Sequence, residues 1–223
     1  MAKIDFDQYA GQYQALIAAQ TGFFDGDNDY FVRYKVERAK ALCGDADAVL
    51  DFGCGVGRAM RYCRAAFPCA DVAGCDPSAE SVAIARRDNP DCRFFAMDEL
   101  SAVSRFDLVL ASCVFHHIAP AERQDALRYC YDRLKPGGHF IIFEHNPYNP
   151  VTQRLVNTCP FDADAVLLTM RETKRRLREA KFAIADSGYC LFFPSQLAAL
   201  RPLEAHLSWL PLGGQYFVSG IKI

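Results

Sequence analysis

Three glycines at alternate positions, Gly53, Gly55 and Gly57, follow a short apolar run that contains Asp51. Glycine allows a backbone to turn tightly and to approach a ligand closely, because no Cβ stands in the way. Asp76 lies 19 residues beyond Gly57, at the end of a second apolar run. A carboxylate about 20 residues after a glycine turn can accept hydrogen bonds from both hydroxyls of a ribose. These residues predict a site for a nucleoside cofactor.

The spacing of the glycines distinguishes two cofactor classes. Dinucleotide-binding enzymes favour G-x-G-x-x-G, with a pyrophosphate against the glycines. Here Asp51 stands two residues before Gly53, and its negative charge favours an ammonium group over a pyrophosphate. The run Asp51-x-Gly53-x-Gly55-x-Gly57, followed by Asp76, resembles the glycine motif of the class I S-adenosylmethionine-dependent methyltransferases of the small-molecule type 11/12 kind. The resemblance implies S-adenosylmethionine as cofactor, with Asp51 near its ammonium and Asp76 on its ribose.

The same resemblance assigns further cofactor contacts. The backbone at Gly53 and Gly55 is expected to hold the methionine part of the cofactor. Asp98 matches the family's acid that accepts a hydrogen bond from the adenine amino group, and Met97 is expected to flank the adenine ring. The other residues expected at the cofactor are Cys54, Gly57, Pro77, Ser112, Tyr9 and Tyr13.

Three histidines are the candidates for acid–base chemistry. His116 and His117 follow the fourth apolar run, and His145 follows the fifth. Histidine has an ordinary pKa that suits a proton acceptor near neutral pH. Because adjacent side chains diverge, at most one of His116 and His117 is expected to face the acceptor. No metal is expected, since the spacing of these residues is not that of a dedicated site and the methyl donor needs no Lewis acid.

The segment after the fifth run contains a partial motif. Asn146-Pro147-Tyr148 resembles part of the Asn-Pro-Pro-Tyr motif of amino-methyltransferases, but that motif follows the fourth strand and has a second proline. We interpret the segment from Asn146 to Pro160 as a loop that shapes the acceptor pocket. In this interpretation Asn146, Tyr148 and Asn149 offer hydrogen bonds to the acceptor.

Alternating apolar and helical segments must position these residues. Such alternation indicates parallel strands joined by crossover helices, whose carboxyl ends meet at one edge of the sheet. Helices are predicted over 78–87, with Ser78 as N-cap, over 121–134 and over 164–181. Two C-terminal runs, 189–193 and 215–223, are predicted to pair antiparallel. The five strand-like runs are 48–53, 72–76, 92–97, 106–112 and 138–144.

The predicted fold is therefore an α/β, Rossmann-like three-layer sandwich. Its sheet has seven mostly parallel strands and closes with a C-terminal antiparallel hairpin, as the resemblance implies. We expect one methyltransferase domain over residues 1–223, with a helical lid segment in 1–46, a cofactor-binding core in 47–145 and an acceptor-side region in 146–223. Tyr9 and Tyr13 are the expected lid contacts, and packing of the N-terminal aromatics on the sheet is the alternative.

Composition limits the partners. The 223 residues carry a formal charge of −2, which argues against a broad nucleic-acid surface. No run of about 18 apolar residues predicts a membrane span. Ten cysteines without a C-x-x-C pair are typical of reduced thiols and predict a cytoplasmic protein.

These observations predict a methyltransferase that acts on an oxygen or nitrogen of a small-molecule acceptor. A methyltransferase for a protein or other macromolecule is one alternative, and a nicotinamide-dependent oxidoreductase is another. The acceptor and the oligomeric state do not follow from the residues.

Overall fold

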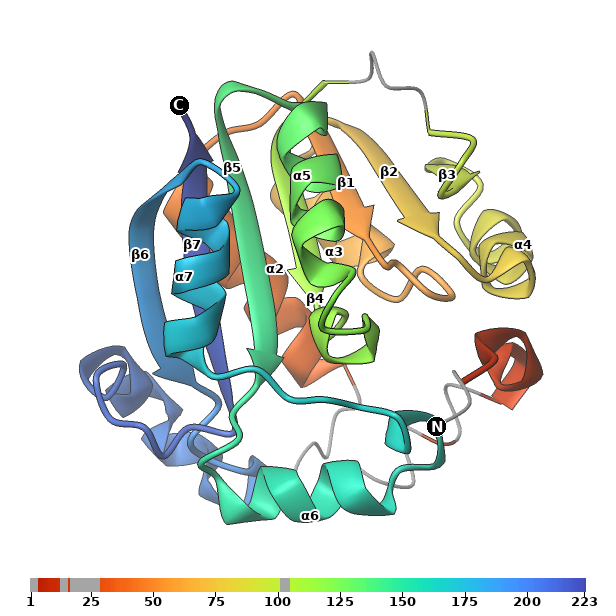
Figure 1. Ribbon diagram of the computed structural model, residues 1–223. Coiled ribbons are helices and arrows are strands. Elements are labelled where there is room, and N and C mark those ends of the chain that lie inside the picture. The colour runs from red at the N-terminus through yellow and green to blue at the C-terminus, as the bar shows by residue number, and fades with distance from the viewer. Residues whose placement is uncertain (1–3, 13–15, 17–28, 101–104) are drawn as a thin grey trace.

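A computed structural model describes residues 4–12, 16, 29–100 and 105–223. Its centre is a seven-stranded sheet in the order β3-β2-β1-β4-β5-β7-β6 (Figure 1). Strands β1 to β5 are parallel to one another, and β7 runs antiparallel to both β5 and β6. The predicted Rossmann-like sheet with an antiparallel C-terminal hairpin is confirmed. The strands are β1 (Ala48–Phe52), β2 (Asp71–Asp76), β3 (Arg93–Ala96), β4 (Phe106–Ser112), β5 (Leu134–His145), β6 (Phe182–Cys190) and β7 (Gln215–Lys222).

Helices cover both faces of the sheet. Helices α5 and α7 lie in front of the sheet in Figure 1, and α2 and α3 lie behind it. Helix α6 crosses the edge at which the parallel strands end. The α-helices of the described part are α2 (Tyr30–Cys43), α3 (Met60–Ala66), α4 (Ala79–Asp88), α5 (Arg123–Arg133), α6 (Pro150–Thr158) and α7 (Met170–Glu179).

Alternation along β1 divides the core between the two faces. Leu50 and Phe52 pack in a cluster with residues of α5 and α7, whereas Val49 packs in a second cluster with residues of α2, α3 and α4. Successive residues of a strand point to opposite faces, so one apolar strand can supply both clusters. The strand that enters the glycine turn is thereby held between two layers of helices.

Side-chain caps explain where several helices begin. Ser78 Oγ accepts a hydrogen bond from Ser81 N at 3.0 Å and caps α4, as predicted. Thr169 Oγ1 accepts from Glu172 N at 3.1 Å, so α7 begins at Met170. The prediction of a helix from residue 164 is therefore wrong over its first turn and a half.

The segment Asn146–Pro160 is not a plain loop. Asn149 Oδ1 accepts hydrogen bonds from Val151 N and Thr152 N, and Pro150 occupies the first turn of α6. Proline is tolerated there because its missing N–H has no partner in a first helical turn. The prolines that suggested a loop in fact mark a helix start.

The C-terminal hairpin is shifted relative to its prediction. The first hairpin strand runs over Phe182–Cys190, not 189–193. The backbone N–H groups of Leu191, Phe192 and Phe193 donate instead to the carboxylate of Glu204, at 3.1 Å each. A buried side chain thus satisfies these N–H groups in place of a neighbouring strand.

The N-terminal segment folds into two short 3₁₀ helices, η1 (Phe6–Gln8) and η2 (Ala10–Gln12). Asp7 Oδ1 accepts hydrogen bonds from Ser78 Oγ at 2.5 Å and from Glu80 N at 3.2 Å, which ties η1 to the start of α4. Tyr13 lies outside the described residues. Among the helices described, none combines the length and apolar character that crossing a membrane requires.

Candidate functional site

Two adjoining cavities lie at the carboxyl ends of β1, β2 and β4. The larger cavity measures about 440 Å³ and the smaller about 210 Å³. Ligands of parallel α/β sheets bind at this edge. Both cavities are lined by Gly53, Gly55, Ser112, Cys113 and His117, so they form one crevice with two halves.

The glycine turn adopts backbone angles that favour glycine. Gly53, Gly55 and Gly57 have φ values of +74°, +51° and +79°. A Cβ on Gly53 would lie 2.5 Å from Val114 Cγ2, whereas a Cβ on Gly55 would meet no atom within 4 Å. Gly53 N donates to Cys75 O at 2.8 Å, which joins the turn to the end of β2. The predicted open approach to the backbone is therefore present at Gly55, and both Gly53 and Gly55 line the crevice.

Asp76 is fixed beside this turn. Its Oδ2 accepts a hydrogen bond from Gly55 N at 2.8 Å, and its Oδ1 accepts from Ser78 N at 2.9 Å. Burial raises the pKa of this carboxyl, while the two N–H donors oppose the rise. Asp76 and Pro77 both line the larger cavity. One lone pair of each oxygen is still available, so the carboxylate can accept the two hydroxyls of a ribose.

Asp51 lies in the smaller half of the crevice. Its side chain comes from β1 and is 4% exposed. Burial raises its pKa to about 7, the Asp76 charge adds to this effect and Lys35 opposes it. A buried carboxylate of this kind gains from a bound cation, because an opposite charge stabilises its ionised form. Cys54, the residue after Gly53, lines the same half.

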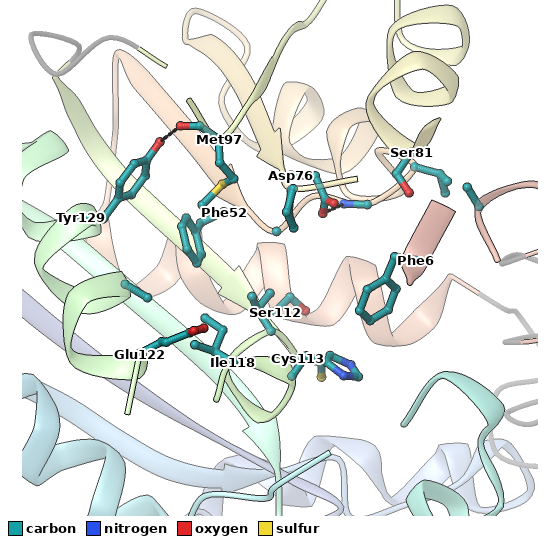
Figure 2. Close-up of a pocket in the computed structure, with 18 of the residues that line it drawn as sticks. Phe6, Phe52, Asp76, Ser81, Met97, Ser112, Cys113, Ile118, Glu122 and Tyr129 are labelled. Carbon is teal, nitrogen blue, oxygen red and sulfur yellow. Dashed lines mark hydrogen bonds between the residues drawn. The ribbon is translucent and has the colours of Figure 1, made fainter. Parts of the chain in front are cut away.

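Aromatic and apolar side chains close the larger cavity. Figure 2 shows Phe52, Met97 and Tyr129 on one side of it and Phe6 on the other, with Asp76 between them. Tyr129 Oη donates to Met97 O at 2.9 Å, which fixes the segment after β3. Sequence reasoning missed Phe6, Phe52 and Tyr129. Their aromatic character was visible, but only long-range contacts bring them to one cavity.

Three residues predicted at the cofactor do not line either cavity. Asp98 is exposed beyond β3, and Gly57 is packed beneath the turn, where an added Cβ would lie 3.1 Å from Ala85 Cβ. Tyr9 is directed to Phe161, with ring centroids 6.4 Å apart. Phe6 and Ala10 are the N-terminal residues that line the larger cavity instead.

The smaller cavity contains a cysteine with cationic neighbours. Cys113 Sγ accepts hydrogen bonds from Lys35 Nζ and Gln215 Nε2, each at 3.3 Å, and Lys35 Nζ also donates to Ser112 Oγ at 2.8 Å. Burial would raise the pKa of this thiol, but Lys35 and His145 lower it to about 6. Cys113 therefore carries a thiolate at neutral pH.

A buried carboxylate organises the turn after β4. Glu144 is 0% exposed and accepts hydrogen bonds from Val114 N at 3.0 Å and Phe115 N at 2.6 Å. Its second oxygen lies 2.6 Å from His116 Nδ1. Burial alone would lower the pKa of His116, but the Glu144 carboxylate raises it. His116 is 1% exposed, and its Nδ1 side is held by the Glu144 carboxylate.

The two adjacent histidines do reach the same cavity, contrary to the expectation that at most one would. Both His116 and His117 line the smaller cavity, together with His145 and Asp162, and His117 also reaches the larger one. The His116 and His117 rings lie 4.0 Å apart and are tilted by 48°. Burial, followed by the nearby His116, lowers the pKa of His117.

The asparagines after β5 do not serve the crevice. Asn146 is fully buried, and its Nδ2 donates to Pro211 O at 3.1 Å and Gly213 O at 2.8 Å. Asn149 caps α6 and donates to Leu212 O at 2.7 Å. Tyr148 is 60% exposed. None of these three side chains lines either cavity, because the two amides bond to backbone groups and Tyr148 is exposed, so the structure does not support the expected hydrogen bonds to an acceptor.

Comparison with known proteins connects this geometry to a family. A family model described as a methyltransferase domain matches residues 50–140. An uncharacterised methyltransferase of Synechocystis is 34% identical over 146 residues, which are 64% of this chain and 66% of that protein. A trans-aconitate 2-methyltransferase of Azoarcus is 26% identical over 60% of this chain and 56% of its own length. In neither relative does the match reach two thirds of its length.

The fold is similar to that of solved structures. A methyltransferase from Archaeoglobus fulgidus, described as dependent on S-adenosylmethionine, superposes with a TM-score of 0.70 at 16% identity, over 95% of this chain and 100% of that one. Its similarity concerns the fold. The matched domain model and the curated relatives show that this chain carries a methyltransferase domain, and its fold is that of the class I S-adenosylmethionine-dependent methyltransferases.

Proposed function

We propose that this chain transfers a methyl group from S-adenosylmethionine to an oxygen or nitrogen of a small-molecule acceptor. The single observation that carries the proposal is the two-part crevice. Its larger half contains the glycine turn and Asp76, and its smaller half adds a group of ionisable side chains. The halves share the residues at which a donor and an acceptor would meet.

The residues of the crevice fit the family's cofactor. Gly55 leaves room beside the backbone, Asp76 is placed for the ribose hydroxyls, and the buried Asp51 suits the ammonium of the methionine part. Phe52, Met97 and Tyr129 provide an apolar wall for the adenine ring. The bound sulfonium supplies a methyl carbon that is already activated for displacement.

The protein's own contribution is then to align the acceptor and exclude water. Phe6 lines the crevice with its ring centroid 5.0 Å from that of His117, so the N-terminal segment would shield the entrance. His117 has a lowered pKa and is uncharged at neutral pH, which lets it accept a proton from an acceptor hydroxyl or amine. His145 lines the same half and is the second candidate.

The size of the smaller half supports a small acceptor. Its volume of about 210 Å³ must also hold the methionine part of the cofactor beside Asp51, which favours a compact acceptor. The Azoarcus relative is named for a small carboxylic acid, trans-aconitate, which agrees with this substrate class. We keep oxygen and nitrogen as acceptor atoms, because histidine can serve both.

Calorimetric titration with S-adenosylhomocysteine tests the cofactor part. Wild type should bind one equivalent, Asp76→Ala should lose binding, and the exposed control Asp88→Ala should bind like wild type. Absence of binding of both the donor and its demethylated product by wild type would refute the proposal. A thermal-shift comparison with NADH separates the alternative oxidoreductase, which would be stabilised by the nicotinamide cofactor instead.

The acceptor part needs a separate experiment. A cell extract, incubated with the purified protein and donor labelled in its methyl group, is divided by filtration into low-molecular-weight, protein and nucleic-acid fractions. Label in the low-molecular-weight fraction that disappears with Asp76→Ala supports a small acceptor. Label confined to protein or nucleic acid overturns that part of the proposal while leaving the donor assignment intact.

A further inference from the structure

Two imidazoles and a carboxylate converge in the smaller half of the crevice. His117 Nε2 lies 3.3 Å from Asp162 Oδ1, and His116 Nε2 lies 3.6 Å from the same oxygen. One potential ligand atom of each residue lies within 4.8 Å of the other two. The histidines come from the turn after β4, and Asp162 comes from the 3₁₀ helix η4 (Pro160–Asp162).

These separations suit a shared cation better than direct hydrogen bonds. A charge-assisted N–H···O bond spans about 2.7–2.9 Å, and both contacts are longer. In a tetrahedral zinc site with bonds of about 2.1 Å, neighbouring ligand atoms stand about 3.4 Å apart. The two histidine–aspartate distances lie on either side of that value, and the three ligand atoms all lie within 4.8 Å of one another.

Each of the two histidines has a second carboxylate near its Nδ1 atom. Glu144 Oε2 lies 2.6 Å from His116 Nδ1, so a proton on Nδ1 directs the lone pair of Nε2 toward Asp162. Behind His117, the Oδ1 atom of Asp164 lies 3.7 Å from Nδ1, and these two buried atoms have no hydrogen-bond partner among the described residues. A hydrogen-bonded carboxylate is the usual support of a metal-binding histidine, and Glu144 provides it for His116.

The backbone fixes the two segments against each other. Val166 N donates to His116 O at 2.8 Å, and Asp162 N donates to Cys159 O at 3.1 Å. The carboxylate of Asp162 is therefore held opposite the histidine pair by main-chain contacts on both sides. Its side chain is 8% exposed and that of His117 is 15% exposed, which leaves both within reach of the cavity.

We propose that His116, His117 and Asp162 bind a divalent transition-metal ion of the zinc class. Two imidazoles and one carboxylate are a preferred ligand set for such ions. The ion would displace the Nε2 proton of His116, whose pKa the Glu144 carboxylate raises, and Glu144, Asp162 and Asp164 supply compensating negative charge.

Three protein ligands would leave room for a further ligand, and all three residues line the smaller cavity. This site departs from the expectation of no metal, and it does not depend on methyl transfer. With the ion bound, His117 would be a ligand, and His145 would be the remaining candidate base.

Binding of Co²⁺ and Zn²⁺ to chelator-treated, fully reduced protein tests the proposal. Because the chain contains ten cysteines, the titration must distinguish nitrogen and oxygen ligands from thiolates. Co²⁺ in the proposed site should give visible ligand-field bands without a thiolate charge-transfer band, and Zn²⁺ should displace it with a stoichiometry of one. Tryptophan fluorescence or circular dichroism verifies that each variant is folded.

Five variants test the ligand assignment. Asp162→Asn and His117→Gln should abolish the ligand-field bands, whereas the exposed control His206→Gln and the neighbouring Cys113→Ser should retain them. Glu144→Gln should weaken Zn²⁺ binding by roughly 10- to 100-fold, because it supports a ligand without being one. Unchanged bands in a folded Asp162→Asn protein, loss of the bands in Cys113→Ser, or no Co²⁺ bands in wild type would each overturn the proposal. The last result would mean that a proton on His116, and not a metal, bridges the carboxylates.

Discussion

Asp76 and Gly55 are joined by a hydrogen bond of 2.8 Å from the glycine N–H to the aspartate Oδ2. The acid expected to hold the ribose therefore also orders the turn that is expected to hold the methionine part. The two halves of the sequence motif, which lie on different strands, depend on each other in the folded protein. Several consequences can be measured.

Replacing Asp76 should impair stability as well as binding. Asp76→Ala leaves the N–H groups of Gly55 and Ser78 without their acceptor, which costs about 1–3 kcal/mol for each buried group that water cannot reach. Asp76→Asn retains one acceptor oxygen and should lose less unfolding free energy. Urea unfolding of both variants without ligand measures the structural part, and equal stability of the two variants would contradict it.

Alanine at the two crevice glycines should have unequal effects. Gly53→Ala adds a Cβ 2.5 Å from Val114 in addition to its strained φ of +74°, whereas Gly55→Ala meets only the strain of a φ of +51°. We expect about 1 kcal/mol of destabilisation for Gly55→Ala and more for Gly53→Ala. The double variant Gly53→Ala/Val114→Ala separates the clash from the strain, since it should recover part of the loss. Thermal unfolding provides the comparison.

Asp51 should make the ligand-free protein less stable as pH rises. Its pKa is raised to about 7 in the folded chain, against about 3.9 in an unfolded one. A raised carboxyl pKa contributes stability that is complete below about pH 4 and is lost as pH rises through about 7. The free energy of unfolding of Asp51→Asn should lack this decline between pH 4 and 7. A cationic ligand should release a proton from Asp51 below pH 7, so calorimetric enthalpies of S-adenosylhomocysteine binding should depend on the ionisation enthalpy of the buffer.

Cys113 should be the most rapidly alkylated thiol of the crevice. Burial raises its pKa, but Lys35 and His145 lower it to about 6, so the thiolate predominates at pH 7. Lys35→Met should raise the apparent pKa of alkylation by iodoacetamide. Mass spectrometry of the modified peptides follows the rate as a function of pH. Cys54, whose pKa burial raises well above the ordinary value, is the internal control.

Loss of Glu144 should be among the most destabilising changes in the crevice. Glu144→Ala removes the acceptor of two backbone N–H groups and the partner of His116, all of them buried. Removing one partner of a buried charge pair costs about 3–5 kcal/mol. The exposed Glu80→Ala should stay within about 0.5 kcal/mol of wild type in the same urea unfolding experiment. A similar midpoint for both variants would show that the network contributes little.

Local signals predicted most of the sheet. The apolar runs of β1, β2, β3 and β4 were placed within one residue at each end, because short buried parallel strands read as uninterrupted apolar segments. The edge strand β6 was misplaced, since it alternates polar and apolar residues while the more apolar Leu191–Phe193 follows it. Those three N–H groups are satisfied by Glu204, a contact that no local pattern reveals.

The candidate site likewise contains residues that a local motif predicts and residues that only tertiary packing brings together. Asp51, Gly53, Gly55 and Asp76 belong to one local motif, and they meet in the crevice as predicted. Phe6 and Tyr129 arrive from elements far apart in the chain, so their positions follow from tertiary packing alone. The convergence of Asp162 on the adjacent histidines likewise depends on where α6 and η4 return to the sheet edge.

The attachment of α6 determines which segments can be exchanged between relatives to change acceptor specificity. The side chains of Asn146, Asn149 and Thr152 donate hydrogen bonds to carbonyl groups of residues 211–214. Helix α6 is therefore attached to the connection before β7 and not to the glycine turn. We therefore expect residues 146–162 and 211–214 to be exchangeable between relatives only as one unit. A chimera in which both segments are taken from a relative should change acceptor specificity and leave donor affinity unchanged. Exchange of one segment alone should leave the side-chain amides of Asn146 and Asn149 without their carbonyl partners.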